Sequence, residues 1–298
     1  MSSPKTKIIV ILGPTCSGKS SLAVQIAKQI DGEVISADSR QVYRGLDLGT
    51  GKITTAEMDG VSHHLLDVAD PSTQFTADDF VREGRTVMED IAGRGKIPII
   101  CGGTGFYIDT LVGRITMPKV PPSLELRAKL ESLSLEELNT LLAEHDPDRA
   151  EVIDTHNPRR LVRALEIAMA DATPIVPQAP TYDVLWLGLT LPLEELFKKI
   201  HTRLIERIDA GMTHEVEKLH ARGLTWERLD SFGLEYRYIA QYLQKRISKP
   251  EFLDTLELRI RQYAKRQITY WKRNKEVRWF APNDKDIGKI VSEFLRIH

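Results

Sequence analysis

The chain has 298 residues, of which 42% are hydrophobic and 28% charged, and its formal net charge is −1. This is the composition of a globular protein, and no stretch approaches the roughly 20 apolar residues that a membrane span requires. The first apolar run leads into a glycine-rich turn instead of a signal-peptide cleavage site, and two cysteines cannot build a disulfide framework, so we expect a soluble, cytoplasmic protein.

Strands and helices alternate along the first part of the chain. Residues 7–12 are a short β-branched run typical of a buried strand, and the spacing of Leu22, Ile26 and Ile30 predicts a helix that Gly32 ends. A strand at 33–37, a helix at 76–92 and a strand at 96–101 follow. This alternation predicts an α/β fold, a core with a doubly wound parallel sheet.

A helical insertion interrupts this pattern. Proline-rich breaks at 117–123 and 173–182 enclose leucine-rich helices and a helix at 158–170, after which residues 184–191 form a returning strand. Helices at 193–210, 213–222, 236–246 and 250–272 complete the chain. We expect a first core part at 1–116, a smaller all-helical insertion domain at 117–180 and a second core part at 181–298.

The strongest motif fits the phosphate-binding loop, or P-loop, G-x-x-x-x-G-K-[ST], and lies between a predicted strand and a predicted helix. In such loops backbone amides converge on an anion at the positive end of the helix, and the lysine adds a charge. We therefore predict a phosphate or diphosphate site formed by Gly13, Pro14, Thr15, Cys16, Ser17, Gly18, Lys19 and Ser20.

Other features of a kinase or NTPase are weak in this chain. No apolar strand ends in a clear Walker B carboxylate, and no compact arginine-rich lid is present in the sequence. The second strand ends instead in Asp38, Ser39, Arg40 and Gln41, at the carboxyl edge of the sheet, where ligands of such folds bind. An Asp in this position is also a common helix cap.

Six motifs in order resemble the tRNA dimethylallyltransferase family and span nearly the whole chain. They are GPTCSGKS from Gly13, SADSRQVYRGLDLGTGK from Ser36, HHLLD from His63, GGTGFY from Gly102, NPRR from Asn157 and KRQIT from Lys265. The family commonly has Gly-Tyr-Arg or Gly-Tyr-Lys where this chain has Glu235, Tyr236 and Arg237.

The resemblance implies an activity. The N6 amine of an adenine next to the anticodon of a tRNA displaces diphosphate from dimethylallyl diphosphate, so the P-loop receives a leaving group and no phosphoryl group moves. A related enzyme that prenylates free AMP, ADP or ATP, a P-loop nucleotide kinase and a non-catalytic RNA-binding protein are the alternatives. We expect a monomer with tRNA and dimethylallyl diphosphate as partners.

The resemblance also assigns roles to residues. Asp38 is the candidate base for the N6 proton, Thr104 lies by the reaction channel, and Thr15 contacts the diphosphate. Mg²⁺ is the expected cofactor, contacted by Ser20. Gln41, with Ser39 and Arg40, would hold the adenine edge.

Basic helices are the expected tRNA contacts, despite the overall charge of −1. Arg259, Gln262, Arg266, Thr269 and Arg273 recur on one helix face, opposite a face of Ile260, Ala264, Ile268 and Trp271. The resemblance places along the tRNA path the residues Asp38, Ser39, Arg40, Gln41, Thr104, Arg127, Arg159, Arg160, Arg163, Tyr236, Arg237, Lys265, Arg266, Gln267 and Thr269. The pair His63 and His64 invites a metal hypothesis, but adjacent residues of an extended segment point to opposite faces, which favours packing or hydrogen bonding.

Overall fold

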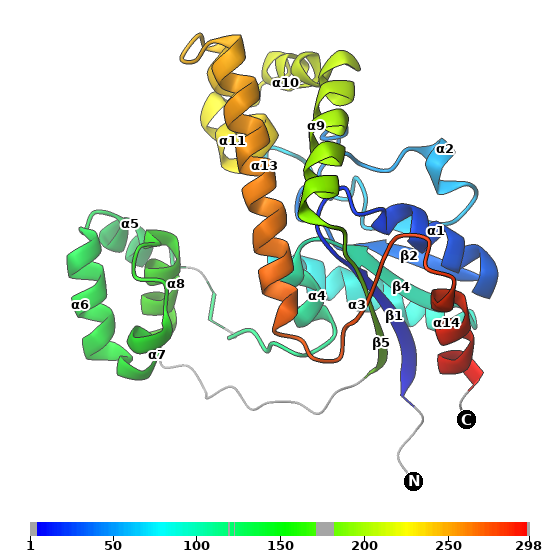
Figure 1. Cartoon of the computed structure of the whole chain (residues 1–298). Coiled ribbons are helices and arrows are strands. Elements are labelled where there is room, and N and C mark those ends of the chain that lie inside the picture. The colour runs from blue at the N-terminus through cyan, green and yellow to red at the C-terminus, as the bar shows by residue number, and fades with distance from the viewer. Residues whose placement is uncertain (1–4, 119, 122, 171–181, 297–298) are drawn as a thin grey trace. The chain divides into compact units, whose positions relative to one another are not determined.

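The computed structural model describes residues 5–118, 120–121, 123–170 and 182–296 (Figure 1). It divides the chain into two compact units, one of residues 1–115 and 180–298 and one of residues 116–179. The core unit is therefore built from both ends of the chain, with a second unit inserted. The predicted junction at 173–182 lies outside the described residues except at its last position.

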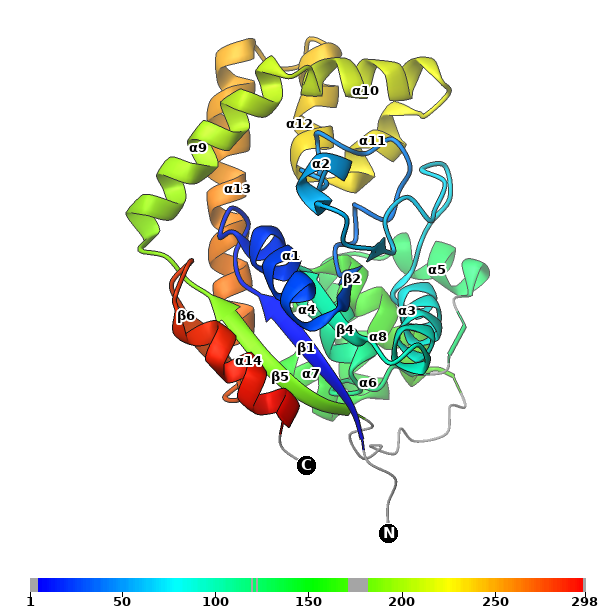
Figure 2. The same cartoon turned by 90° about the vertical axis from the view of Figure 1, so that its right-hand side faces the viewer.

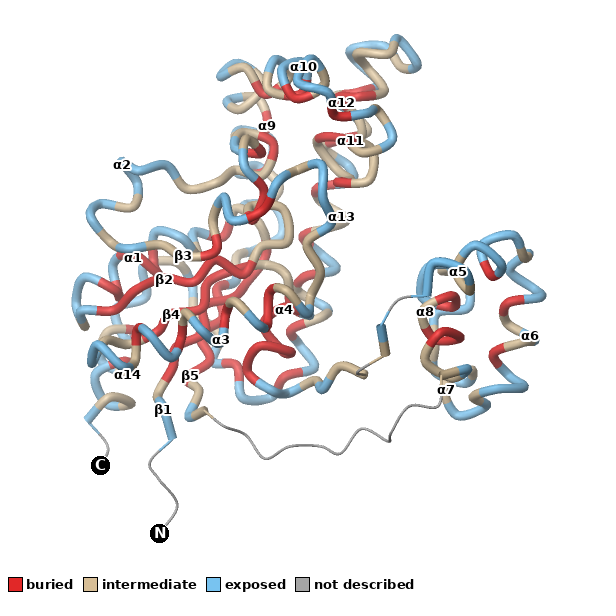
Figure 3. Tube along the Cα trace, turned by 180° about the vertical axis from the view of Figure 1, so that it is seen from behind, coloured by how far each residue is buried: buried red, intermediate tan, exposed pale blue. Residues whose placement is uncertain are grey.

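A six-stranded parallel sheet forms the centre of the core unit. Its strands are β1 (Thr6–Leu12), β2 (Gly32–Ser36), β3 (His63–His64), β4 (Ile97–Gly102), β5 (Tyr182–Leu189) and β6 (Arg278–Phe280), in the order β3-β2-β4-β1-β5-β6. The central strands are buried along most of their length, as Figure 3 shows in red, and only the first residues of β1 and β4 are partly exposed. Burial on both faces explains why β1 is a continuous apolar run and does not alternate with polar residues.

Helices cover both faces of this sheet. Ile9 and Ile11 pack with α1 (Lys19–Ile30) and α14 (Asp286–Arg296), whereas Ile8 and Val10 pack on the other face with α3 (Ala77–Gly93) and α4 (Gly105–Leu111). Figure 2 shows α1 and α14 on one side of the strands and α3 on the other. Successive residues of β1 thus serve opposite layers, and the predicted doubly wound α/β fold class is confirmed.

A helical group with its own apolar core continues the core unit. It contains α9 (Leu193–Asp209), α10 (Met212–Ala221), α11 (Trp226–Phe232), α12 (Leu234–Leu243) and the long α13 (Lys249–Lys272). Val42, Tyr43 and Leu46, from the loop after β2, pack into the same core. This packing ties the loop that carries Asp38 to the helices that follow β5.

The inserted unit, described by itself, is four short helices around seven buried aliphatic residues. The helices are α5 (Leu124–Glu131), α6 (Leu135–His145), α7 (Pro147–Val152) and α8 (Pro158–Ala168). Asn157 caps α8 by accepting from the Arg160 amide at 3.3 Å, and Pro158 is the first helical residue.

The sequence did not predict seven of the described elements: α2 (Thr55–Met58), β3, α4, α7, α11, β6 and α14. Six of them are short, whereas α14 is an 11-residue helix with a clear apolar face that sequence reasoning missed. The helix predicted at 236–246 begins earlier, at Leu234, and ends at Leu243. Among the described helices, none is long and apolar enough to cross a membrane.

Candidate active site

The P-loop turns sharply between β1 and α1. Cys16 and Gly18 have φ values of +62° and +88°, and a Cβ on Gly13 would lie 2.6 Å from the carbonyl oxygen of Leu189 in β5. The amides of Gly18, Lys19 and Ser20 donate to no acceptor among the described residues. They lie at the positive end of α1, so they are available to an anion.

Lys19 is folded back onto this loop. Its ammonium donates to the carbonyl oxygen of Pro14 at 2.6 Å, and burial lowers the pKa of Lys19 below its usual range. A bound diphosphate would stabilise the charged amine and raise the pKa again. The side chain of Ser20 lines the same cavity, where a hydroxyl can contact a hard cation.

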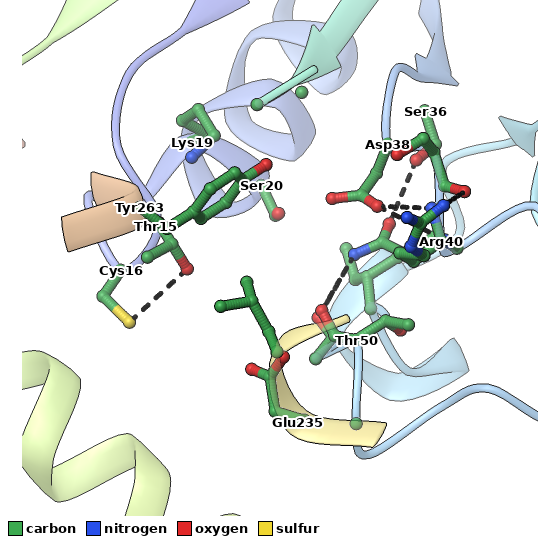
Figure 4. Close-up of a pocket in the computed structure, with 18 of the residues that line it drawn as sticks. Thr15, Cys16, Lys19, Ser20, Ser36, Asp38, Arg40, Thr50, Glu235 and Tyr263 are labelled. Atoms are coloured by element: carbon green, nitrogen blue, oxygen red, sulfur yellow. Dashed lines mark hydrogen bonds between the residues drawn. The ribbon is translucent and has the colours of Figure 1, made fainter. Parts of the chain in front are cut away.

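Asp38 lies in the loop after β2 and has one oxygen in use. Its Oδ1 accepts from the amides of Arg40, at 2.8 Å, and Gln41, at 3.3 Å. Figure 4 shows the other oxygen pointing into the open space that Lys19 and Ser20 border from the opposite side. The two amides fix the orientation of the carboxylate, and the second oxygen stays available to a ligand.

The neighbours of Asp38 are held mainly by the protein itself. Gln41 accepts from Ser36 Oγ at 3.0 Å, and its Nε2 lies 3.5 Å from the carbonyl oxygens of Thr50 and Gly51. Arg40 donates to the carbonyl oxygen of Phe232 at 2.7 Å. Gln41 and Arg40 both line the cavity, but they shape its wall through these bonds.

Thr104 connects this loop to the turn after β4. Its hydroxyl accepts from the Ser39 amide at 3.1 Å, and its own amide donates to the carbonyl oxygen of Ala37 at 3.1 Å. The side chain does not cap α4, which begins at Gly105. Thr104 is not among the residues that line the cavity, and its bonds hold the Asp38 loop in place.

The P-loop and the Asp38 loop share one cavity of about 570 Å³ in the core unit. Thr15, Cys16, Ser17, Gly18, Lys19 and Ser20 line one side, and Asp38, Ser39, Arg40 and Gln41 line another. The remaining walls include the loop at 49–57, α9, the turn between α11 and α12, the start of α12, and α13. The predicted phosphate site and the predicted base are thus brought together although their strands are not adjacent in the sheet.

Two residues predicted to bind tRNA are buried side chains that line the cavity, and their contact with tRNA stays a prediction. Tyr236 is 2% exposed, and its hydroxyl donates to Glu215 at 2.7 Å beneath the loop at Gly49. Gln267 is 6% exposed, with both ends of its amide bonded to backbone groups. Through these bonds both side chains support the walls of the cavity.

The predicted two-faced pattern of α13 is confirmed. Ile260, Ala264 and Trp271 are buried, and the residues exposed on the helix include Arg259, Lys265, Arg266, Thr269 and Arg273. Arg266 also lines the cavity, and Arg237, from α12, lines it while bonded to the carbonyl oxygen of Asp230. Arg273 pairs with the buried Asp109 at 2.5 Å.

In the inserted unit, the four predicted arginines differ in their contacts. Arg159 is exposed, and Arg160 lies 3.5 Å from the carboxylate of Asp154. Arg127 and Arg163 instead bond to the buried carboxylate of Glu166, at 2.8 Å and 3.1 Å. Arg163, which is 35% exposed, is therefore engaged by the buried carboxylate of Glu166, whereas Arg159 is exposed.

Both histidines form hydrogen bonds within the chain, as the geometry predicted, and His63 also lines the cavity. His63 Nδ1 lies 2.9 Å from the carbonyl oxygen of Val61, and His64 Nε2 lies 2.8 Å from the buried carboxylate of Glu33. Across the described ranges of the chain, no three His, Cys, Asp or Glu side chains come together as a metal site.

The IPP transferase family model matches residues 41–274. The chain belongs to this family. A tRNA dimethylallyltransferase 2 of Treponema denticola is 45% identical over 91% of this chain and 93% of the relative. A tRNA dimethylallyltransferase of Halalkalibacterium halodurans is 36% identical over 97% and 95%.

Solved IPP transferase structures agree with this assignment. The full-length tRNA isopentenylpyrophosphate transferase of Bacillus halodurans superposes with a TM-score of 0.75 at 35% identity, covering 98% of this chain and 97% of that one. A eukaryotic dimethylallyltransferase acting on tRNA superposes with a TM-score of 0.80 at 27% identity, covering 97% and 77%. The eukaryotic chain is the longer of the two, because a match over 97% of this chain covers only 77% of that one.

This IPP transferase departs from the family pattern at Glu235, and the structure shows what accommodates the acid. Its carboxylate lies 3.2 Å from Arg207, and each side chain is 14% exposed. Arg207 also bonds to the carbonyl oxygens of Leu48 and Gly49 in the cavity wall. The added negative charge is therefore paired within the site.

Sequence reasoning missed Arg203, Arg207 and Tyr263, which line the IPP transferase cavity. The two arginines are four residues apart, beside the buried stripe of Leu196, Ile200 and Leu204 on α9. Two arginines four residues apart, next to an apolar stripe, share one helix face and could have indicated an anion-binding wall from the sequence. Tyr263 and Gln267 are likewise four apart on α13, polar residues on the packed side of a basic helix.

Proposed function

We propose that this protein transfers a dimethylallyl group from dimethylallyl diphosphate to N6 of an adenine next to the anticodon of a tRNA, releasing diphosphate. The observation that carries the proposal is the shared cavity, in which an anion-binding loop and the oxygen of Asp38 face the same space. The names of its relatives, which are tRNA dimethylallyltransferases, supply the substrate class.

The P-loop would stabilise the leaving group. The free amides of Gly18, Lys19 and Ser20 and the ammonium of Lys19 would bind the diphosphate oxygens, whose charge grows as the C1–O bond breaks. Thr15 lines the same side and would offer its hydroxyl. These groups are fixed before reaction, so little reorganisation is needed as the charge develops.

Asp38 would take the proton. The lone pair of N6 forms the new bond to C1, the electrons of the C1–O bond leave with diphosphate, and the amine proton passes to the free oxygen of Asp38. The bonds from the Arg40 and Gln41 amides hold the carboxylate in one orientation for this step. Thr104 would act indirectly, through the Ser39 amide.

Mg²⁺ is proposed as a cofactor that neutralises diphosphate charge when bound. Ser20 offers one hydroxyl at the loop, which fits the habit of Mg²⁺ to take one or two protein ligands together with phosphate oxygens and water. The exposed cations of α13, Lys265 and Arg266, would contact the RNA backbone. Arg159 and Arg160 in the inserted unit are proposed as further contacts.

Mass analysis of nucleosides tests this proposal. Unmodified tRNA incubated with the protein, dimethylallyl diphosphate and Mg²⁺ should gain one five-carbon unit on adenosine. Replacing Asp38→Asn keeps an oxygen for the two amides but removes the base, and should slow transfer by roughly 10²–10⁴-fold. Asp254→Asn, which changes an exposed carboxylate near the N-terminus of α13 that does not line the cavity, is the control and should act like the wild type.

A parallel incubation with AMP distinguishes the related activity on free nucleotides. The exposed basic face of α13 favours a polynucleotide, so we expect modified tRNA and unmodified AMP. Prenylated AMP with unmodified tRNA would contradict the proposal.

A further inference from the structure

One buried side chain joins the two halves of the cavity. Gln267, on α13, accepts from the Thr15 amide of the P-loop at 2.8 Å through its Oε1. Its Nε2 donates to the carbonyl oxygen of Gly103, in the turn after β4, at 3.1 Å. The residue is only 6% exposed. Both polar ends are therefore satisfied by loops that are far apart in the sequence.

The turn at Gly103 extends this connection to Asp38. Gly103 is followed by Thr104, which binds the Ala37 carbonyl and the Ser39 amide on either side of Asp38. A continuous path thus runs from the P-loop through the amide of Gln267 to the loop of the proposed base. No other described side chain bonds to both the P-loop and this turn.

The chemistry of the path requires a carboxamide at this position. The Thr15 amide needs an acceptor and the Gly103 carbonyl needs a donor, and among uncharged side chains of this length an amide supplies both. A glutamate would place an oxygen against the Gly103 carbonyl oxygen. Space is equally restrictive, because a Cβ on Gly103 would lie 2.1 Å from Nε2 of Gln267.

The bond also decides which P-loop amide faces the diphosphate. The Thr15 amide is directed at Gln267 and is not available to the anion, whereas the amides of Cys16, Gly18, Lys19 and Ser20 bond to no acceptor among the described residues. Gln267 thereby fixes the position of the loop without occupying the anion site.

We propose that Gln267 is a positioning residue that sets the distance between the diphosphate and the carboxylate of Asp38. This rests on the proposed function, because the distance matters only if a group leaves at one side and an amine attacks at the other. Displacement of reacting groups by about 1 Å can cost roughly 10²-fold in rate. Loss of the bridge therefore lowers kcat, whereas donor and tRNA binding depend on groups elsewhere.

The test uses Gln267→Met, which keeps the length of the side chain and removes both bonds. We expect kcat for tRNA prenylation to fall by roughly 10- to 100-fold. The KM for dimethylallyl diphosphate and the affinity for inorganic diphosphate should stay within about threefold of the wild-type values. Gln244→Met is the matched control, since that half-buried amide bonds only to the Ala240 carbonyl, and it should leave all three values unchanged.

A second variant disrupts the contact between Gln267 and Gly103 from the Gly103 side. Gly103→Ala pushes a methyl group onto Nε2 and should reproduce the loss of kcat. The double variant should be no slower than the slower single variant, because both changes break one connection. This variant also keeps the proposal testable if Gln267→Met does not fold.

Two outcomes overturn the inference. An unchanged kcat in both variants shows that the bridge does not position the reaction, and a parallel loss of kcat, diphosphate affinity and thermal stability shows a merely structural role. Failure of the proposed function looks different, because wild-type protein would then modify no tRNA at all.

Discussion

The inserted unit should lose much of its stability if the charge of Glu166 is removed. This side chain is completely buried, and its oxygens accept from Arg127 at 2.8 and 2.9 Å, from Arg163 at 3.1 Å and from the Ser123 amide at 3.0 Å. Glu166→Gln keeps the shape but leaves two guanidinium groups without their counter-ion.

The size of the effect follows from the exposure of the partners. Removing one member of a fully buried pair costs about 3–5 kcal/mol, whereas an exposed pair is worth about 0–1 kcal/mol. Arg127 and Arg163 are 30% and 35% exposed, so water partly replaces the lost contact. We therefore expect the free energy of unfolding of the unit to fall by about 2 kcal/mol, from a total of roughly 3–10 kcal/mol.

Amide hydrogen exchange in the full-length protein measures this loss locally. Amides of α6 and α8, which surround the buried leucines of the unit, should exchange about 30-fold faster in Glu166→Gln, since 1.36 kcal/mol is a factor of ten. Glu144→Gln, which changes an exposed carboxylate on α6, is the control. Amides of β1 and β4 in the core unit should be unaffected.

The pH dependence checks the cause. Burial acts to raise the pKa of Glu166, but the bonds from Arg127, Ser123 and Arg163 outweigh it, so the pKa is lowered from 4.5. A carboxyl group with a lowered pKa stabilises the fold above its unfolded pKa and loses that contribution as the pH falls. The difference between the variant and the wild type should therefore shrink below pH 4.5. A difference that persists in acid, or exchange within twofold of the wild type at neutral pH, would refute the reasoning.

Three further predictions concern the core unit. Arg266→Ala should weaken binding of every tRNA and reduce the slope of the logarithm of the tRNA association constant against the logarithm of salt concentration by about one. Diphosphate affinity should stay unchanged, and an unchanged slope in filter-binding titrations would contradict the prediction. Gly102→Ala should prevent folding, because its Cβ would lie 2.2 Å from the carbonyl oxygen of Ala37, whereas Gly93→Ala, with open space, should leave the melting temperature nearly unchanged. Glu33→Gln should cost about 2 kcal/mol at neutral pH, because bonds from Arg94 lower the pKa of Glu33 to about 2. The stability difference between wild type and variant should shrink as the pH falls from 4.5 to 2, and urea unfolding curves of both proteins across that range would show it.

The sequence determined the features that local chemistry controls. The apolar run of β1, the glycine and lysine spacing of the P-loop and the two-faced pattern of α13 were readable because period and turn chemistry act over a few residues. The short elements β3, β6 and α11 were not readable, since strands of two or three residues and a single helical turn or two owe their existence to the neighbours they pack against.

Only the tertiary structure decided which polar residues face the substrate space. Gln267 and Tyr236 lie in motifs that suggested RNA contact, yet each is buried because its helix turns that side toward a loop from another part of the chain. Arg203 and Arg207 had no motif and line the cavity because α9 packs beside it. A residue's type and spacing determine which kinds of bond it can form, whereas its partner is set by the tertiary contacts between separate segments of the chain.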